Sequence, residues 1–322
     1  MGRSRLYRDG MLVAEDFALE DVGSHVGATG VTVWLDLCAP TPEELAALGE
    51  KLGLHELAVE GAASEHQRPK LDRYDGHLFV NVYAVRLDPT EGQLETSEIA
   101  AFVAGNVLIT VRKNEFDIDA VLARWDGSPD LAKYGVGFLL HGLLDYVVDG
   151  HFAAVQVLDD ALESLEDTLF ADTPGPDTIQ RRSFALRKSL VLLRRVVLPM
   201  REVVNALMRR DLGVVEPPMV PYYQDVYDHV LRATEWTESL RDLVTTILET
   251  RLTIQGNRMN SIMKKVTSWA AIIAVPTAIT GFYGQNVPYP GYAQAAGFYT
   301  STAVTVVLSL TLYALFRRRD WI

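Results

Sequence analysis

From Val266 to Phe316 the sequence contains no aspartate, glutamate, lysine, arginine or histidine. Two apolar stretches inside this segment, 266–286 and 295–316, each provide the ~20 residues with which a helix crosses a bilayer. The proline-rich segment 287–294 between them is predicted to be a short outer loop. The alternative is a pair of buried core helices, but a soluble protein rarely ends in so long an uncharged stretch. We therefore expect two C-terminal transmembrane helices.

Basic residues flank the uncharged segment at both ends. Lys264 and Lys265 precede the first span, and the tail 317–322 opens with three arginines. Because lysine and arginine concentrate in cytoplasmic loops, both termini are expected in the cytoplasm. The polar N-terminus has no apolar core like that of a signal peptide, so the C-terminal segments are expected to direct insertion. These features predict a multi-pass protein of the cell's inner (plasma) membrane.

The sequence before residue 266 carries nearly all the charge and is predicted to form a cytoplasmic body. Residues 1–125 alternate between strand-like and helix-like segments, as in an α/β domain. Residues 126–221 are predicted to form a helical hairpin region, and 222–265 a cytoplasmic stalk helix that continues into the first span. The predicted fold class is therefore an α+β cytoplasmic domain followed by long helices and two C-terminal transmembrane helices.

Three local signals predict details of the cytoplasmic body. Thr41, with Glu44 three residues later, predicts a capping box at the start of a helix. Gly105-Asn106, between two β-rich runs, predicts a hairpin turn. Cys38 is the single cysteine and has no histidine near it in the sequence, so it is predicted to be a buried core residue. A lone cysteine cannot form an internal disulfide, which indicates a reducing compartment.

The composition and the motifs argue against two classes of function. The net charge of −12 argues against non-specific nucleic-acid binding, which needs a basic surface. The run Gly135-Val-Gly137 lacks the third glycine of a phosphate-binding loop, and the histidines show no metal-ligand spacing. We therefore expect no nucleic-acid partner and no enzymatic activity.

A heptad-like stripe runs along the stalk and the first span. Its steps alternate between four and three residues, which keeps the positions on one face of a helix. The stripe consists of Glu249, Thr253, Gly256, Asn260, Met263, Thr267, Ala270, Ala274, Thr277, Gly281 and Gly284. Inside the membrane these residues are small or weakly polar, which fits either a pore lining or close packing between helices. Since two spans cannot enclose a pore, conduction would require an oligomer around a shared axis.

The first span ends in the motif Tyr283-Gly284-Gln285-Asn286, and a short loop and a last span that ends in basic residues follow it. The motif resembles Tyr-Gly-Met-Asn, the signature of the CorA family of metal-ion transporters. Further matches are 260–267, 276–277 and 281 in the first span, and 34–36, 42–45, 52–55 and 66–75 in the body.

The resemblance implies a funnel-shaped homopentamer for the uptake of Mg²⁺, and often also of Co²⁺ or Ni²⁺, driven by the membrane potential. It places the selectivity filter at Gly284, Gln285 and Asn286, where a ring of Asn286 amides binds the hydrated ion. The stripe and the resemblance together give the pore-lining positions: Asn260 and Thr277, which match polar positions, Met263, which matches a hydrophobic constriction, and Thr267, Ala270, Ala274 and Gly281.

Two departures from the family pattern leave the transported metal open. Gln285 stands where the motif has methionine, and the loop 287–294 has no aspartate or glutamate. Because variant motifs occur in the family's Zn²⁺-transporting relatives, a Zn²⁺ transporter is one alternative; a membrane metal sensor that does not conduct is another. The family also implies regulatory metal binding at cytosolic carboxylates. Glu249 and Asp88 are candidates, and a solvated surface role is the alternative for each.

Overall fold

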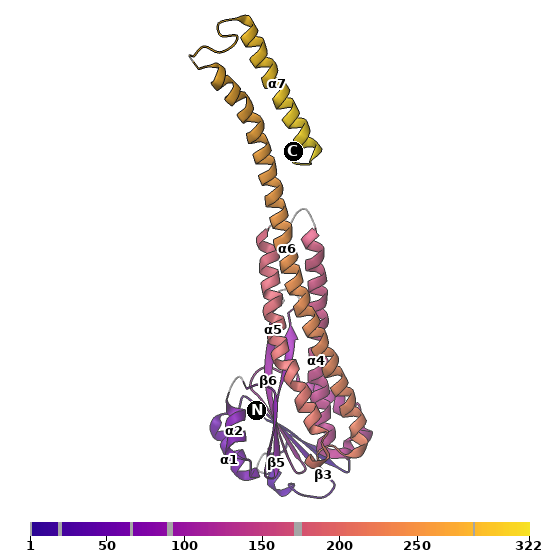
Figure 1. Ribbon diagram of the computed structural model, residues 1–322. Helices are drawn as coiled ribbons and strands as arrows, with labels where there is room; N and C mark the ends of the chain where they lie inside the picture. Colours follow the sequence, from indigo (N-terminus) through magenta and orange to yellow (C-terminus); the bar gives the residue numbers. More distant parts are fainter. Residues whose placement is uncertain (1, 19–20, 65–66, 89–92, 171–175, 286) are drawn as a thin grey trace. The chain divides into compact units, whose positions relative to one another are not determined.

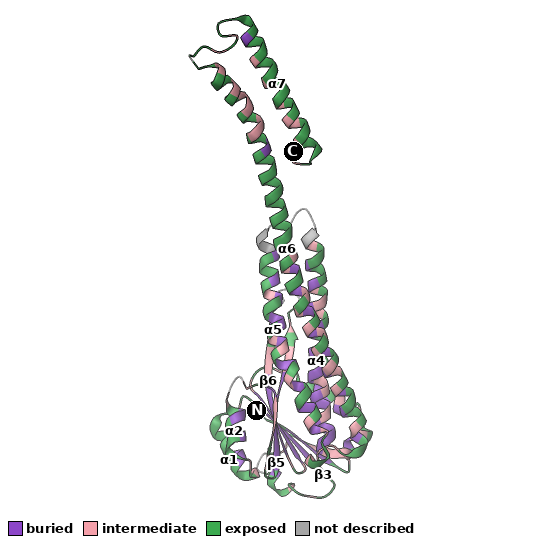
Figure 2. Ribbon diagram, in the orientation of Figure 1, coloured by how far each residue is buried: buried purple, intermediate pink, exposed green. Residues whose placement is uncertain are grey.

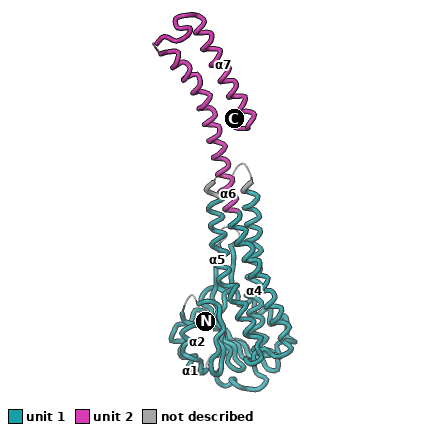
Figure 3. Tube along the Cα trace, viewed as in Figure 1, with its two compact units in different colours: residues 1–246 teal, residues 247–322 magenta. Residues whose placement is uncertain are grey.

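The computed structural model describes residues 2–18, 21–64, 67–88, 93–170, 176–285 and 287–322. It divides into two compact units, Met1–Thr246 and Ile247–Ile322, which Figure 3 colours separately. The division falls inside one long helix, α6 (Val220–Tyr283), so each unit contains part of this helix.

In the described part of the chain, a seven-stranded mixed sheet forms the centre of the first unit (Figure 1). The strands are β1 (Arg3–Arg8), β2 (Met11–Glu15), β3 (Val31–Cys38), β4 (Lys70–Tyr74), β5 (His77–Leu87), β6 (Leu94–Ala104) and β7 (Val107–Arg112). Their order in the sheet is β2-β1-β3-β7-β6-β5-β4, with β3 and β7 parallel and the other neighbours antiparallel. β6 and β7 form a hairpin with Ala104 opposite Val107, which confirms the turn predicted at Gly105-Asn106.

Helices cover both faces of the sheet. α1 (Pro42–Leu52) and α2 (Glu56–Ala63) pack on one face, and α3 (Ile118–Asp126) and α4 (Gly135–Phe170) on the other. α5 (Pro176–Leu207) and the first part of α6 also contribute to the core on the α4 side. Short 3₁₀ turns lie at Asp21–Ser24, Pro129–Tyr134, Arg210–Leu212 and Pro217–Met219.

The strands alternate between two hydrophobic cores, one on each face of the sheet. Along β3, Val33 and Leu35 belong to the core under α1 and α2, whereas Trp34 belongs to the core under α3 and α4. This alternation follows from the period of two in a strand. Because both faces are covered, β3 contains an almost continuous hydrophobic run.

The sheet and the long helices share one core. Leu143 of α4, Val203 of α5 and Tyr223 of α6 lie in the same hydrophobic cluster as side chains from the sheet. A single compact unit therefore contains the segments 1–125 and 126–221 and the start of the stalk helix.

A buried polar network joins the two central strands. Arg112 donates from Nε (3.0 Å) and Nη2 (2.6 Å) to the carboxylate of Asp36, which is fully buried. The hydroxyl of Thr110 donates to the same carboxylate at 2.8 Å, and Nη1 of Arg112 donates to the carbonyl of Phe116 at 3.1 Å. The parallel register of β3 and β7, which pairs Asp36 with Thr110, brings these groups together.

The capping prediction at Thr41 is confirmed. The Thr41 hydroxyl accepts a hydrogen bond from the Glu44 N–H at 3.2 Å, and the Thr41 N–H donates to the Glu44 carboxylate at 2.9 Å. The helix ends before Gly53, whose φ of 66° is left-handed and therefore suits glycine.

The prediction that Cys38 is buried is wrong, because its side chain is exposed. Cys38 is the last residue of β3, and the chain leaves the strand at Ala39, whose φ is 48°. At this end of the strand Cys38 lines a surface hollow together with residues such as Arg86 and Phe116. The last side chain of a strand can thus be exposed to solvent even when the rest of the strand is buried.

His151 in α4 is completely buried and neutral at physiological pH. Its Nε2 lies 2.7 Å from the Tyr83 carbonyl, and because a carbonyl can only accept, Nε2 carries the proton. Desolvation lowers the pKa of His151 to about 4, against 6.5 in the unfolded chain. The unfolded state therefore binds more protons between these two pKa values. The contribution to stability is complete above pH 6.5 and is lost as the pH falls toward 4.

We expect the free energy of unfolding to fall by about 2–3 kcal/mol through His151 between pH 7.5 and 4.5. Urea unfolding of the detergent-solubilised chain, followed by tryptophan fluorescence at both pH values, measures this loss. The variant His151→Gln retains an N–H for the Tyr83 carbonyl but does not titrate, so it should lose less stability over the same range. An equal loss in both proteins would contradict the assignment.

Candidate functional site

The second unit consists of the rest of α6 and of α7 (Ala295–Arg318), connected by a loop. By length and composition both helices are able to cross a membrane; only 6% of the most apolar window of α6 and 0% of that of α7 is buried within the protein. Figure 2 shows both helices as mostly exposed in this unit. So large an apolar surface requires lipid or further protein around it.

A third helical stretch, Pro129–Thr168, is also long and apolar enough to cross a membrane. In this stretch, which contains most of α4, 61% of the apolar window is buried inside the first unit. Leu140, Leu143 and Leu144 belong to the core beside the sheet. Since the sheet already covers this apolar face, we assign the stretch to the core of the first unit.

In the second unit the apolar part of α6 has one covered face and one exposed face. The buried or half-buried residues of α6 are Ser268, Ala271, Ile272, Val275, Pro276, Ile279 and Tyr283. Those of α7 are Gly297, Ser301, Thr305, Ser309, Leu312, Tyr313 and Phe316. Each set repeats mainly at intervals of three or four residues, as one face of a helix does. The two helices of the hairpin therefore turn these faces toward each other.

The predicted stripe lies on the opposite face of α6. At the helical angle of about 100° per residue, its centre is roughly 160° from the centre of the covered face. The stripe residues Asn260, Met263, Thr267, Ala270, Ala274, Thr277, Gly281 and Gly284 are all exposed. A Cβ added at Gly256 or Gly281 would meet no atom within 4 Å. The hairpin thus leaves the stripe free.

Between Thr253 and Gly284 the polar side chains of the stripe are hydroxyls and an amide, which carry no charge. The hydroxyl of Thr277 donates to the carbonyl of Ile273 at 3.0 Å, and that of Thr253 donates to the carbonyl of Glu249 at 3.0 Å. A hydroxyl that donates to its own helix still has lone pairs with which to accept hydrogen bonds from water. This part of the stripe can therefore contact a hydrated ion without binding it as a carboxylate would.

The end of α6 is a tight turn at the predicted filter. The N–H of Gly284 donates to the carbonyl of Thr280 at 2.8 Å, and that of Gln285 donates to the carbonyl of Phe282 at 3.3 Å. A Cβ at position 284 would lie 2.9 Å from the Thr280 carbonyl oxygen, so glycine alone fits this turn without a backbone shift. Asn286, the other predicted filter residue, lies outside the described residues.

The two candidate regulatory carboxylates, Glu249 and Asp88, are both exposed. Glu249 lies on α6, and Asp88 directly follows β5, where its N–H donates to the carbonyl of Gln93 at 3.0 Å. Among the residues that the structure describes, no group of three or more histidine, cysteine, aspartate or glutamate side chains could hold a metal ion. A regulatory role for either residue stays a prediction.

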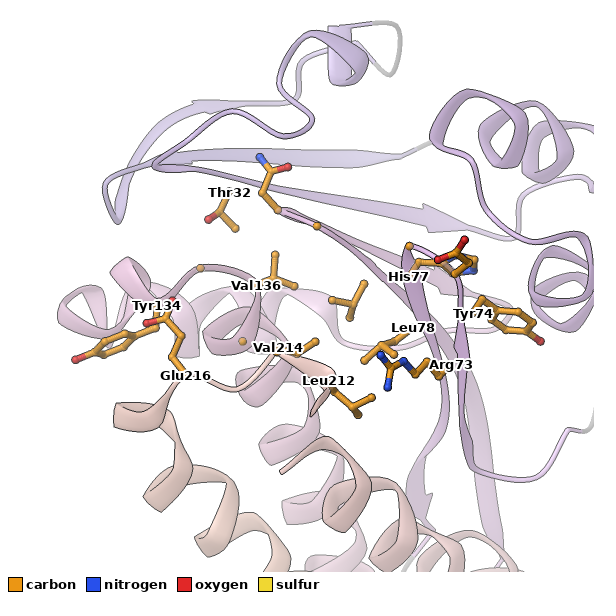
Figure 4. A pocket seen from close by; sticks show the side chains of 18 residues that line it. Thr32, Arg73, Tyr74, His77, Leu78, Tyr134, Val136, Leu212, Val214 and Glu216 are labelled. Atoms are coloured by element: carbon orange, nitrogen blue, oxygen red, sulfur yellow. The ribbon is translucent and has the colours of Figure 1, made fainter. Parts of the chain in front are cut away.

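A hollow of about 650 Å³ lies in the first unit beside the start of α4 (Figure 4). Two of its polar side chains are engaged within the protein. Arg73 pairs with Asp211 at 3.2 Å, and the amide of Asn106 donates to the carbonyls of His25 and Val31 at 2.9 Å. Most of the other side chains labelled in Figure 4 are apolar or aromatic. We assign no metal or substrate to this hollow.

The family described as CorA-like Mg²⁺ transporter protein matches residues 29–318 of the chain. The chain belongs to this CorA family. The match includes strands β3 to β7 of the sheet, the long helices and both apolar C-terminal helices. It confirms the family indicated by the motif at the end of α6. Relatives of the chain in this family are ion transporters and not enzymes.

Two curated relatives of the chain are named for different transported metals. The chain is 30% identical over 278 residues to the cobalt/magnesium transport protein CorA of Thermotoga maritima, covering 85% of this chain and 79% of that protein. It is 25% identical over 293 residues to the zinc transport protein ZntB of Yersinia pseudotuberculosis, covering 90% and 88%. Relatives named for different metals therefore match almost the whole chain.

A solved structure confirms the predicted fold class of this CorA-family chain. The complete structure of the CorA magnesium transporter from Methanocaldococcus jannaschii matches with a TM-score of 0.80 at 24% identity. The match covers 100% of this chain and 99% of that one. An α/β body, long helices and apolar C-terminal helices are thus common to both proteins.

Proposed function

We propose that the protein forms a homopentamer in the cell's inner membrane and takes up hydrated divalent cations, with Mg²⁺ as the main ion. The observation that carries this proposal is the exposed stripe of small and weakly polar residues on α6, opposite the face that turns toward α7. A hairpin of two helices cannot enclose water, so the stripe requires further copies around a shared axis. The basic flanks of the hairpin support an orientation with both termini in the cytoplasm and the loop outside.

The chemistry of the stripe favours an ion that keeps its water. Mg²⁺ loses its hydration shell reluctantly, and between Thr253 and Gly284 the stripe offers hydroxyls, an amide and backbone carbonyls but no carboxylate. Such weak ligands allow the ion to leave as well as to enter. The membrane potential supplies about 2.3 kcal/mol per charge and 100 mV, and thus about twice that for a divalent ion.

Selection occurs at Gly284, Gln285 and Asn286 in this proposal. The tight turn at Gly284 supports it, since a side chain there would collide with the Thr280 carbonyl. The amides of five Asn286 residues surround the entrance and bind the water shell of the ion, because an amide both donates and accepts hydrogen bonds. Glu249 and Asp88 are retained as cytosolic positions at which Mg²⁺ regulates passage.

The transported ion separates the main proposal from its two alternatives. Relatives named for cobalt and magnesium and for zinc both match the chain, and Gln285 departs from the motif. Uptake of Mg²⁺, Co²⁺, Ni²⁺ and Zn²⁺ by proteoliposomes that contain the full-length protein decides between them. Mg²⁺ uptake that depends on an inside-negative potential supports the channel. Zn²⁺ uptake without Mg²⁺ uptake supports a zinc transporter, and binding without uptake of any ion supports a sensor.

The pore assignment of the stripe predicts which side chains water reaches. In a background with the exposed Cys38 replaced by serine, we expect Ala274→Cys to react with a charged, membrane-impermeant thiol reagent and to lose uptake as it does so. The matched variant Val275→Cys, on the face toward α7, should react at least about tenfold more slowly. Equal rates for the two cysteines would show that the stripe packs against other helices and does not face water.

A further inference from the structure

Four aromatic side chains form a cluster where α6 ends and the outer loop begins. The ring of Tyr289 lies edge-on to the ring of Tyr283, with 5.0 Å between centroids, and edge-on to that of Tyr292 at 5.4 Å. Phe282 contacts Tyr283 at 5.6 Å and Tyr289 at 6.3 Å. Tyr289 is therefore the residue that joins the loop to the last turn of α6.

The hydroxyl of Tyr289 makes a specific contact inside this cluster. It donates to the backbone carbonyl of Tyr283 at 3.0 Å. Tyr283 is the last residue of α6, and the final carbonyls of a helix have no partner within the helix. Tyr289 thus supplies, from six residues further along the chain, the donor that this helix end lacks.

This contact holds the peptide that leads into the filter. The carbonyl of Tyr283 and the N–H of Gly284 belong to the same rigid peptide plane. The oxygen side of the plane is held by Tyr289, and the N–H side by the carbonyl of Thr280 at 2.8 Å. A hydrogen bond on each side restrains rotation of the plane and so favours one direction in which the chain leaves α6 toward Gln285.

We propose that Tyr289 is a positioning residue for ion selection, acting through the Tyr283–Gly284 peptide. This inference rests on the proposed function, since it concerns the filter at the end of α6. A site that recognises an ion through its water shell needs its groups held within about 0.5 Å and 10–20°. The loop 287–294 contains no acidic residue to attract the ion. Discrimination therefore depends on the direction of neutral groups, which Tyr289 fixes.

Anchoring of the helix at the membrane surface is a simpler role for Tyr289, and it predicts a different effect of removing the hydroxyl. Tyrosines gather at membrane–water interfaces, where the ring lies among the headgroups and anchors the helix. An anchor needs the ring, which phenylalanine largely retains, whereas the proposed role needs the hydroxyl. Tyr292 provides a matched control, because its hydroxyl makes no hydrogen bond to any residue that the structure describes.

The test compares Tyr289→Phe with Tyr292→Phe in full-length protein reconstituted into liposomes. Loss of one hydrogen bond at the helix end should raise the half-saturating Mg²⁺ concentration about fivefold and lower the preference for Mg²⁺ over Ca²⁺ by a similar factor. The maximal rate should not fall, because the water-filled path is unchanged. Tyr292→Phe should match the parent in both quantities. Equal values for both variants and the parent would overturn the proposal.

A second measurement does not depend on transport. Amide hydrogen exchange of a peptide that contains Gly284 should quicken about fivefold in Tyr289→Phe and stay unchanged in Tyr292→Phe. Unchanged exchange in both variants would overturn the positioning role even if uptake differs. If the parent takes up no divalent cation, the channel itself is refuted, whereas faster exchange in Tyr289→Phe would still support the contact that the inference requires.

Discussion

Asn286→Ala is expected to abolish the selectivity of Mg²⁺ uptake while the oligomer stays intact. In the proposed filter the Asn286 amide hydrogen-bonds to the water shell of the ion, and alanine can neither donate nor accept. Loss of two such bonds at ~1 kcal/mol each lowers discrimination about 30-fold, and loss of the whole ring removes it. Alanine also widens the mouth, so ions with other hydration shells should enter.

Uptake of Mg²⁺ against competing Ca²⁺ in proteoliposomes measures this effect, and size-exclusion chromatography in detergent checks the oligomer. Gln294→Ala is the matched control, since Gln294 carries an exposed amide in the same outer loop but precedes α7 and lies outside the motif. This control should retain parental selectivity. Parental Mg²⁺ flux and selectivity in Asn286→Ala would rule out its proposed role in the filter.

Asp36→Ala is expected to lower the free energy of unfolding of the first unit by about 3–5 kcal/mol. The substitution leaves the guanidinium of Arg112, whose side chain is only 11% exposed, without its carboxylate. It also removes the acceptor of the Thr110 hydroxyl, at the junction of the central strands β3 and β7. An unpaired buried charge costs more than a missing hydrogen bond, so this effect should exceed that of an ordinary core truncation.

Urea unfolding followed by tryptophan fluorescence measures the loss, because Trp34 donates to Thr110 in the same network. The double variant Asp36→Leu with Arg112→Met removes both charges and should recover most of the stability, since well-packed apolar residues can replace a buried ion pair. A double variant as unstable as Asp36→Ala would show that the loss arises from packing and not from the unpaired charge.

The sequence indicated the membrane segments and the family because both depend on local information. An uncharged stretch of bilayer length is rarely anything other than a membrane helix, and the four-residue motif lies at the end of the first such stretch. The heptad stripe was equally readable, since a helix maps residue spacing onto one face. The capping box at Thr41 and the hairpin turn at Gly105 were predicted correctly for the same reason, because each involves residues within a few positions of one another.

The sequence did not reveal contacts between residues far apart in the chain. Asp36 and Arg112 pair across 76 positions because β3 and β7 are neighbours in the sheet, and strand order is not encoded in any local pattern. The error at Cys38 has a related cause, since its exposure depends on where the strand ends relative to the layers around it. Tyr289 was not singled out, although four aromatic residues spaced closely around the loop were a usable signal.

Spacing along the chain therefore determined that this protein has two apolar C-terminal helices of bilayer length and a stripe of mainly small and weakly polar residues, because hydrophobicity and helical period act over a few turns. Tertiary structure decided which face of α6 turns toward α7 and is thus unavailable to a pore. It also decided that a tyrosine in the outer loop reaches back to the carbonyl of Tyr283. These are consequences of how the chain folds back on itself, and a spacing rule cannot express them.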